Sequence, residues 1–393
     1  MSHNTEDHNS FSFELSEDHQ AIRAAIREFA ENEIRPHVSH LDETQTFPTE
    51  IFQKLGNLGF LGVVIPTEYN GSGLGYMEYA IIVEEVARVC PSIALGVAAH
   101  NGLCMNHIYR FGSQMLRDKY VRDLATGREL GGWGLTEPNA GSDAGGTQTT
   151  ARREGDHYIL TGSKNFITHG NVGNVAVVMA MTDASKGKKG ISAFAIDKSM
   201  EGFYASKKES KLGMRSSDTA SLTFDNVRVP ADHLIGNEGE GFTQALQILD
   251  GGRISIAALS VGCAQGAFEA AMKYSRERVQ FGKPIGDQQG IMMKLARMSM
   301  NIDAARALTY KSAWLRDTGK PFGKEASQAK LFASEVAVNV SEEAIQIHGG
   351  YGYIKEFPVE KFWRDSKLLT IGEGTSEVQK LVIARQELAA IRS

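Results

Sequence analysis

Residues 371–380 read Ile371-Gly372-Glu373-Gly374-Thr375-Ser376-Glu377-Val378-Gln379-Lys380 and lead directly into an apolar-periodic segment at 381–385. The two glycines around Glu373 leave the backbone open to close approach by another molecule and permit φ values that other residues resist. Thr375 or Ser376 can then cap the following helix. These residues alone allow two interpretations of Glu373, a functional acid or a solvated charge favoured by the helix dipole.

The composition of the whole chain is that of an ordinary globular protein. It has 393 residues, 42% hydrophobic and 23% charged, which is enough for two or three domains. A net charge of −5 without long runs of Lys or Arg disfavours nucleic-acid binding. The first ten residues lack the pattern of a signal or transit peptide, and no apolar run approaches the length of a membrane span. We therefore expect a cytoplasmic protein.

Three cysteines, Cys90, Cys104 and Cys263, lack the paired spacing of a disulfide framework or a zinc site. Each stands among apolar or small residues. We expect three reduced, buried thiols and no metal centre.

The first part of the chain, residues 10–128, has helical patterns after a polar head that we expect to be disordered to about Asn9. Ser16 can cap a helix in which Ile22, Ile26 and Phe29 recur at helical spacing. A second helix is indicated by Pro48-Thr49-Glu50 and ends near Gly56. Further helices are expected over 77–86 and 115–124, which makes this a helical domain.

One segment of this part imitates a dinucleotide-binding fingerprint. Val63-Val64-Ile65 has the composition of a short strand, and Gly71-Ser72-Gly73-Leu74-Gly75 precedes a helix that carries Glu84 and Glu85. However, Tyr76 occupies the position of the third glycine, and four residues separate the strand from the glycines. We interpret the segment as a glycine-rich turn and not as a Rossmann site.

The middle part, residues 129–238, changes to short β-rich runs separated by turn residues. Residues 148–153 and 157–161 flank Gly155-Asp156 and predict a hairpin. Further strands are expected at 175–179, 191–196 and 219–229, the last ending at Pro230. This part is expected to be a small antiparallel β domain.

The last part, residues 239–393, is helical almost to its end. Apolar stripes over 242–275, 291–305, 325–347 and 376–389 predict four long helices in an antiparallel bundle. Methionines 292, 293, 298 and 300 are interpreted as core residues. The fold class is therefore a multidomain α+β protein of helical, β and helical parts.

Five segments of this chain, taken together, resemble the signatures of the acyl-CoA dehydrogenase family. In chain order they are Trp133-Gly134-Leu135-Thr136-Glu137-Pro138-Asn139-Ala140-Gly141-Ser142-Asp143, Gly162-Ser163-Lys164-Asn165-Phe166-Ile167-Thr168, Arg276-Glu277-Arg278-Val279-Gln280-Phe281-Gly282, Gln346-Ile347-His348-Gly349-Gly350 and Glu373-Gly374-Thr375. The resemblance extends from about residue 13 to residue 385. It implies the same helical, β, helical architecture.

The resemblance also implies an FAD enzyme without a Rossmann fold, with the flavin between the β domain and the C-terminal bundle. Residues implied beside the flavin are Trp133, Leu135, Thr136 and Ser142, with Phe166 and Thr168 on its other side and Thr168 near N5. Residues implied for the ADP half, across a subunit interface, are Arg278, Phe281, Gln289, Gln346 and Gly350. Thr375 and Glu377 complete the implied cofactor residues. Taken singly, Thr136 and Thr168 also suit plain strand positions.

In this resemblance Glu373 is the base that removes the α-proton of an acyl-CoA while the β-hydrogen leaves as hydride to flavin N5. Its own amide, next to Gly374, would donate to the thioester carbonyl. Ser142 and residues 250–253 would line the thioester path, although Arg253 with Asp250 also suits a buried structural salt bridge. Electrons would leave through an electron-transferring flavoprotein. The enzyme would be a homo-oligomer, at least a dimer and usually a tetramer.

Departures from related branches narrow the expected substrate. Gly252 stands where the isovaleryl branch carries its base, and Ala94 stands where the glutaryl branch carries an Arg. Gly372 replaces a Tyr that is common before the base, which would widen the acyl pocket. The short-chain, butyryl branch is most similar, and a short or branched acyl-CoA oxidised to its trans-2-enoyl product is expected. The alternatives are a flavin-dependent oxidase or monooxygenase of this fold and a non-catalytic helical scaffold.

Overall fold

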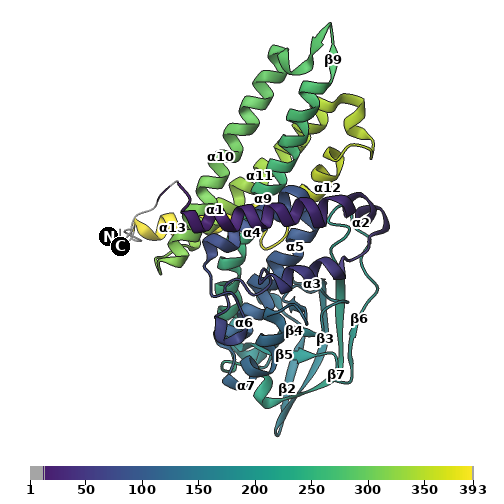
Figure 1. The fold of residues 1–393 in the computed structure, drawn as a ribbon. Coiled ribbons are helices and arrows are strands. Elements are labelled where there is room, and N and C mark those ends of the chain that lie inside the picture. The colour runs from purple at the N-terminus through teal and green to yellow at the C-terminus, as the bar shows by residue number, and fades with distance from the viewer. Residues whose placement is uncertain (1–11, 13, 392–393) are drawn as a thin grey trace, which may run out of the picture.

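The computed structural model describes residue 12 and residues 14–391, which form three parts (Figure 1). Helices α1 (Glu17–Phe29), α4 (Tyr76–Val89) and α5 (Pro91–Ala99) cross the middle of the molecule, with the β-sheet on one side of them and the long C-terminal helices on the other. The polar head expected to be disordered to about Asn9 lies outside the described residues. The helical, β, helical order predicted from the sequence is confirmed.

The first part is helical, and its first helix begins where the sequence predicted. The Ser16 side chain accepts a hydrogen bond from the His19 amide at 3.2 Å, and Ile26 and Phe29 are buried on the inner face. The helices are α1 (Glu17–Phe29), α2 (Val38–Thr44), α3 (Thr49–Asn57), α4 (Tyr76–Val89), α5 (Pro91–Ala99), α6 (Met105–Phe111), α7 (Gln114–Leu116) and α8 (Arg122–Ala125).

The strand expected at residues 63–65 does not form. Val63 and Ile65 are buried, but their carbonyl groups accept from the Leu74 and Gly73 amides, both at 2.9 Å, within one compact loop. The Val63 amide donates to the Asn101 side chain at 2.9 Å. These bonds use the backbone groups that a sheet neighbour would need. The dinucleotide-binding interpretation therefore fails in the structure, as its sequence departures indicated.

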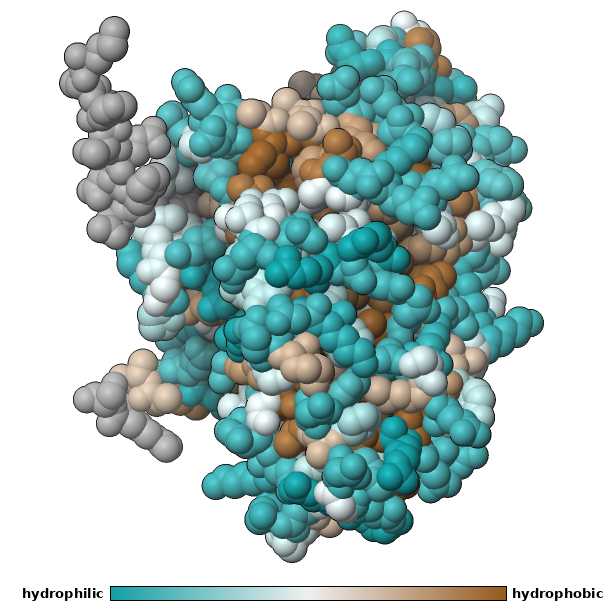
Figure 2. Space-filling view, turned by 60° about the horizontal axis from the view of Figure 1, so that its bottom comes forward, coloured by the Kyte–Doolittle hydropathy of each residue, from teal (hydrophilic) through white to brown (hydrophobic). Residues whose placement is uncertain are grey.

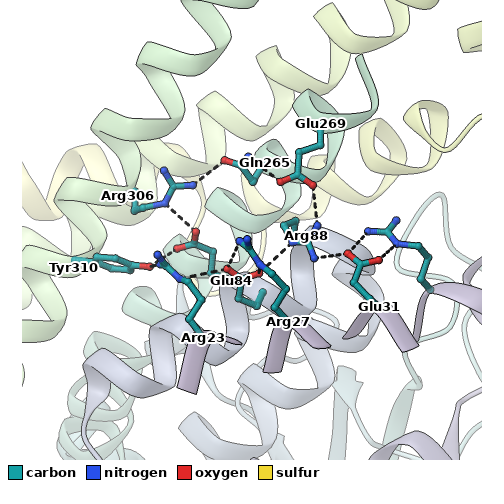
Figure 3. A network of polar contacts seen from close by, with 11 residues as sticks. Arg23, Arg27, Glu31, Glu84, Arg88, Gln265, Glu269, Arg306 and Tyr310 are labelled. Atoms are coloured by element: carbon teal, nitrogen blue, oxygen red, sulfur yellow. Dashed lines mark hydrogen bonds and ion pairs between the residues drawn. The ribbon is translucent and has the colours of Figure 1, made fainter. Parts of the chain in front are cut away.

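The two acids of that imitation, Glu84 and Glu85, belong to a buried polar network that joins α1 and α4 to the C-terminal helices (Figure 3). Glu84 accepts from the Arg306 Nε at 2.9 Å and from the Tyr310 hydroxyl at 2.7 Å. Arg27 binds both carboxylate oxygens of Glu85, at 2.8 and 2.9 Å. Arg88 connects Glu85 to Glu269 of α9 (Gly241–Glu277). The pairing offsets the cost of burying these charges.

The middle part is one twisted sheet with the strand order β6-β7-β3-β2-β4-β5-β8, and β1 pairs with β4. It is antiparallel as predicted, apart from parallel pairing of β1 and β2 with β4. The predicted hairpin is β2 and β3, joined at Gly155-Asp156. The strands are β1 (Gly131–Gly134), β2 (Thr150–Glu154), β3 (His157–Thr168), β4 (Val175–Met181), β5 (Ile191–Asp197), β6 (Phe203–Ala205), β7 (Thr219–Pro230) and β8 (Leu234–Ile235).

The last part contains the four predicted helices and one that the apolar stripes did not reveal, α12. The three longest helices pack on one another, and α12 and α13 pack against α11. A small hairpin joins α9 to α10 at the end of the molecule far from the sheet (Figure 1). The elements are α9 (Gly241–Glu277), β9 (Val279–Gln280), β10 (Lys283–Pro284), α10 (Gln289–Asp317), α11 (Gly323–His348), α12 (Val359–Leu369) and α13 (Ser376–Ala390).

Helix α9 forms the centre of the protein. Over the described residues it alone has the length and hydropathy of a membrane span, and 78% of its most apolar 18-residue window is buried within the protein. The core helix of a globular protein has the same properties. The face in Figure 2 consists mainly of hydrophilic residues, and apolar residues reach its surface in separate patches. Cys90, Cys104 and Cys263 are free and buried, as predicted.

Candidate active site

Glu373 lies in the turn between α12 and α13. It adopts a left-handed conformation, with φ +52°, and Gly374 follows with φ +94°. The Ser376 amide donates to the Thr370 carbonyl at 3.0 Å and closes the turn. Thr375 is the N-cap, since its hydroxyl accepts from the Val378 amide at 3.3 Å. The structure thus selects Thr375 from the two caps that the sequence allowed.

Two side chains from different helices hold the backbone of this turn. Gln379 of α13 donates to the Glu373 carbonyl at 3.3 Å and to the Gly374 carbonyl at 3.1 Å. Lys330 of α11 donates to the Gly374 carbonyl at 2.7 Å. A Cβ on Gly374 would lie 2.5 Å from the Gln379 amide nitrogen, so that both its φ and its surroundings require glycine.

The Glu373 side chain points at helix α9. Its Oε2 atom is buried and has no hydrogen-bond partner within the described part of the chain. A Cβ built on Gly252 of α9 would lie 2.1 Å from this oxygen. Burial raises the pKa of Glu373 to about 7, although the positive charges of Lys330 and Arg253 oppose the rise. This carboxyl is therefore poised to accept a proton near neutral pH.

Arg253 and Asp250 lie one turn apart on α9 and pair with each other. The Arg253 Nη1 is 2.5 Å from the Asp250 Oδ1 and 3.4 Å from the Ser327 hydroxyl. Arg253 is buried, and its Nε has no partner within the described residues. Of the two roles expected for Arg253, the structure contains the buried salt bridge.

A second group of residues lies on the sheet, where the first two signature segments meet. The Asn165 amide donates to the Thr136 carbonyl at 2.8 Å. The buried Lys164 ammonium binds the Glu137 carboxylate at 2.6 Å and the Leu135 carbonyl at 3.2 Å. These bonds place Leu135 and Thr136, which follow Trp133 of β1, beside the segment of β3 that contains Phe166 and Thr168.

Phe166 is turned outwards by a β-bulge. The pairing of β3 with β7 shifts register between Lys164 and Ile167, and Phe166 takes a left-handed φ of +61°. Phe166 is 67% exposed, whereas Asn165 is half-buried and Ile167 is buried. Thr136 and Thr168 are half-buried. An exposed aromatic face with hydroxyl groups close to it in the sheet fits a planar flavin such as that of FAD. Ser142 lies in the exposed loop after β1.

A third group, Arg278, Phe281, Gln289, Gln346 and Gly350, lies at the far end of the bundle. Arg278 and Gly350 line a cavity of about 450 Å³, where the Arg278 guanidinium lies 5.4 Å from the centre of the Tyr351 ring. Phe281, at the tip of the β9–β10 hairpin, is 95% exposed. This end is remote from the sheet within one chain (Figure 1). A single copy therefore does not unite these residues with the first two groups.

The methionine stripe of α10 also lies in this region, and its interpretation as core was wrong for most of it. Met298 is buried, but Met292, Met293 and Met300 are 56–64% exposed. Helical spacing shows which residues share a face and does not show whether another element covers that face.

The sequence did not single out Lys330 or Gln379, which hold the turn of Glu373. One signal was present for Lys330, because it stands on the apolar stripe of α11 beside Ala326, Ala329 and Ala333. A lysine on a buried stripe needs a polar partner. The identity of that partner depends on the tertiary structure.

The chain is similar to known proteins over nearly its whole length. Three family profiles match the chain in order: "Acyl-CoA dehydrogenase, N-terminal domain" over 16–128, "middle domain" over 132–227 and "C-terminal domain" over 239–388. The short-chain specific acyl-CoA dehydrogenase of Clostridium acetobutylicum is 47% identical over 95% of this chain and 98% of its own length.

Two solved structures have nearly the same fold. Butyryl-CoA dehydrogenase from Megasphaera elsdenii is 43% identical with a TM-score of 0.94, covering 96% of this chain and all of that one. A chain from a study of the electron transferring flavoprotein of Acidaminococcus fermentans is 44% identical with a TM-score of 0.95 and the same coverage. These likenesses confirm the predicted fold, the reaction class and FAD as the cofactor. The chain belongs to the acyl-CoA dehydrogenase family.

Proposed function

We propose that this chain oxidises a short or branched acyl-CoA to its trans-2-enoyl-CoA and that Glu373 is the base that removes the α-proton. One observation carries the proposal. The Glu373 Oε2 is buried without a hydrogen-bond partner among the described residues, faces the bare backbone of Gly252, and belongs to a carboxyl whose pKa burial raises to about 7. A structural carboxylate in such a place would be expected to have a hydrogen-bond donor.

The backbone of the same turn supplies a second group. The Glu373 amide makes no hydrogen bond within the described residues. It remains free to donate to the thioester carbonyl and to stabilise the negative charge that develops there as the α-proton leaves. Base and donor then come from one residue, and their relative position is set by the left-handed turn.

Bound FAD supplies the acceptor for the β-hydride. Trp133, Leu135, Thr136, Phe166 and Thr168 would hold its flavin ring against the sheet, with Ser142 in the adjoining loop. Thr375 and Glu377 would lie at its edge near the α13 N-terminus. Asp250 and Arg253 would border the thioester path, where their mutual salt bridge keeps both side chains in place.

The residues at the two positions that distinguish related branches favour an uncharged acyl chain. Ala94 is fully buried and offers no cation for a second carboxylate. A Cβ on Gly372 would meet no atom closer than 3.6 Å, so the missing side chain leaves space next to the base. The short-chain and butyryl-CoA dehydrogenases among the relatives support a substrate of this size.

The third group of residues suggests a second copy of the chain. We propose that a partner subunit brings Arg278, Phe281, Gln289, Gln346 and Gly350 to the ADP half of FAD, in a dimer or tetramer. An electron-transferring flavoprotein, as named for the Acidaminococcus structure, is the proposed electron acceptor.

The test is the visible absorbance of the purified holoenzyme before and after anaerobic addition of butyryl-CoA. We expect the flavin band to bleach in the wild type and to persist in Glu373→Gln. Bleaching of Glu373→Gln at the wild-type rate would refute Glu373 as the base. Flavin that no short, branched or medium-chain thioester bleaches would refute the substrate class, and rapid reoxidation by air would favour an oxidase.

A further inference from the structure

Lys330 lies on the buried face of α11. Its side chain is fully buried, and its ammonium group donates to the Gly374 carbonyl at 2.7 Å. No carboxylate of a described residue lies within 4.0 Å of it. An ammonium group without an ion-pair partner is costly to bury. Because the protein keeps this charge next to the Glu373 turn, a role in that turn is indicated.

The charged and titratable groups around Glu373 come from four helices. Arg253 of α9 faces it, but Asp250 partly neutralises that guanidinium at 2.5 Å. Tyr79 of α4 contributes a hydroxyl that is neutral near pH 7, since burial raises its pKa well above the usual value. The Glu377 carboxylate of α13 raises the pKa of Lys330. Lys330 of α11 is therefore the cation with the least compensation near the proposed base.

We propose that Lys330 is a positioning residue for the α-proton transfer: its ammonium group fixes the Gly374 carbonyl, and so the turn that aims Glu373 at Gly252, and its charge keeps Glu373 ionised at the pH of catalysis. The inference rests on the proposed role of Glu373 as the base. Lys330 itself does not touch the substrate in this arrangement.

The electrostatic part of this role agrees with the titration of both groups. Among the charges that oppose the burial of Glu373, Lys330 has the largest effect on its pKa. Burial in turn lowers the pKa of Lys330 to about 8. The ammonium is thus mostly charged at the midpoint of the Glu373 titration, near pH 7.

Gln379 allows the two parts of the role to be separated. It donates to the same Gly374 carbonyl at 3.1 Å but carries no charge. Gln379→Leu removes an anchor of the turn and leaves the electrostatics unchanged. Lys330→Met removes the anchor and the charge, Lys330→Gln removes the charge but keeps a donor, and Lys330→Arg keeps the charge.

The experiment measures the pH dependence of kcat/KM for butyryl-CoA in each holoenzyme, with flavin content and thermal midpoint as checks of the fold. Loss of an opposite charge close to a carboxyl raises the pKa of that carboxyl. In Lys330→Met and Lys330→Gln the acidic limb of the profile should therefore move to higher pH by about one unit. Lys330→Arg should keep the wild-type limb. Gln379→Leu should lower the rate at every pH without moving the limb. Lys324→Met, a lysine of the same helix that pairs with Glu387, should match the wild type.

A second readout needs no turnover. The infrared carbonyl band of the protonated Glu373 carboxyl is identified by its loss in Glu373→Gln. It should titrate at higher pH in the two neutral variants of Lys330, Lys330→Met and Lys330→Gln. An unmoved limb and band in a neutral variant that binds flavin would overturn the inference. So would an equal shift in Lys330→Arg, or loss of the fold in both neutral variants.

The same series separates this inference from the proposed function. If Glu373→Gln bleaches like the wild type, the base assignment fails first. If Glu373→Gln is inactive and the Lys330 variants keep the wild-type profile, only the role of Lys330 is refuted.

Discussion

Gly252→Ala should inactivate the enzyme without unfolding it. The added Cβ would lie 2.1 Å from the Glu373 Oε2, whereas non-bonded heavy atoms approach to about 3.5 Å. The carboxylate would have to retreat by roughly 1 Å, a displacement that can cost about 100-fold in rate. In the interior of α9, alanine is favoured over glycine by ~1 kcal/mol. The fold should therefore remain stable while kcat/KM falls by about 100-fold.

The assay is the rate of anaerobic flavin bleaching by butyryl-CoA in four proteins: wild type, Gly252→Ala, Glu373→Gln and the double variant. Thermal midpoint and flavin absorbance report the fold. Because the methyl group acts through the Glu373 carboxyl, the double variant should be no slower than Glu373→Gln alone. Gly290→Ala, at a helical glycine with open space around its Cβ, is the matched control.

Two results would refute this reasoning. Wild-type bleaching by Gly252→Ala would mean that the carboxylate is not confined against α9. Losses that add fully in the double variant would mean that the methyl group acts elsewhere, for example on the path of the thioester. A fall in thermal midpoint together with flavin loss would instead attribute the effect to the packing of α9.

Four further outcomes follow from particular contacts. Gly372→Tyr should fold, because no atom lies within 3.6 Å of the new Cβ, and should shift kcat/KM in an acyl-CoA panel towards shorter chains. Glu84→Ala removes a buried carboxylate that pairs with Arg306 and accepts from the Tyr310 hydroxyl, so the free energy of unfolding in urea should fall by about 3 kcal/mol. Lys164→Met removes the ion-pair partner of the buried Glu137 carboxylate and should lower the free energy of unfolding by a similar ~3 kcal/mol in the same assay. Burial lowers the pKa of His169 to about 3, below its value of about 6.5 in the unfolded chain, so acidification protonates the unfolded chain first. The free energy of unfolding should therefore be highest above about pH 6.5 and fall as the pH drops, less steeply in His169→Asn.

The regular elements of this fold could be predicted because their signals are local. The β2–β3 hairpin follows from two β-rich runs around Gly155-Asp156, and α9 follows from its apolar stripe. The failures have tertiary causes. Residues 63–65 have the composition of a strand, but their partners are an adjacent loop and the side chain of Asn101. Helix α12 is short and carries Lys361 and Asp365 on its buried face, which masks its periodicity.

In the candidate site too, some features could be predicted from the local sequence and others depend on tertiary contacts. Glu373 and its glycines could be identified from ten contiguous residues, together with the resemblance. The outward turn of Phe166 depends on a register shift against β7, and the anchor of the Glu373 turn comes from Lys330, 44 positions before Gly374. Neither relation has a signature in the local sequence. Contacts of this kind require the packed structure.

The contact between Glu373 and Gly252 bears on the resemblance to the isovaleryl branch, which implies a base at the position of Gly252. A side chain at position 252 would project into the volume that the Glu373 Oε2 occupies, since its Cβ would already lie 2.1 Å from that oxygen. Only one carboxylate fits there, whichever backbone supplies it. In the proposed reaction, the substrate and not the chain position would set where the proton acceptor lies. In this protein, glycine at 252 and the left-handed turn at 373–374 leave that volume to the Glu373 carboxyl.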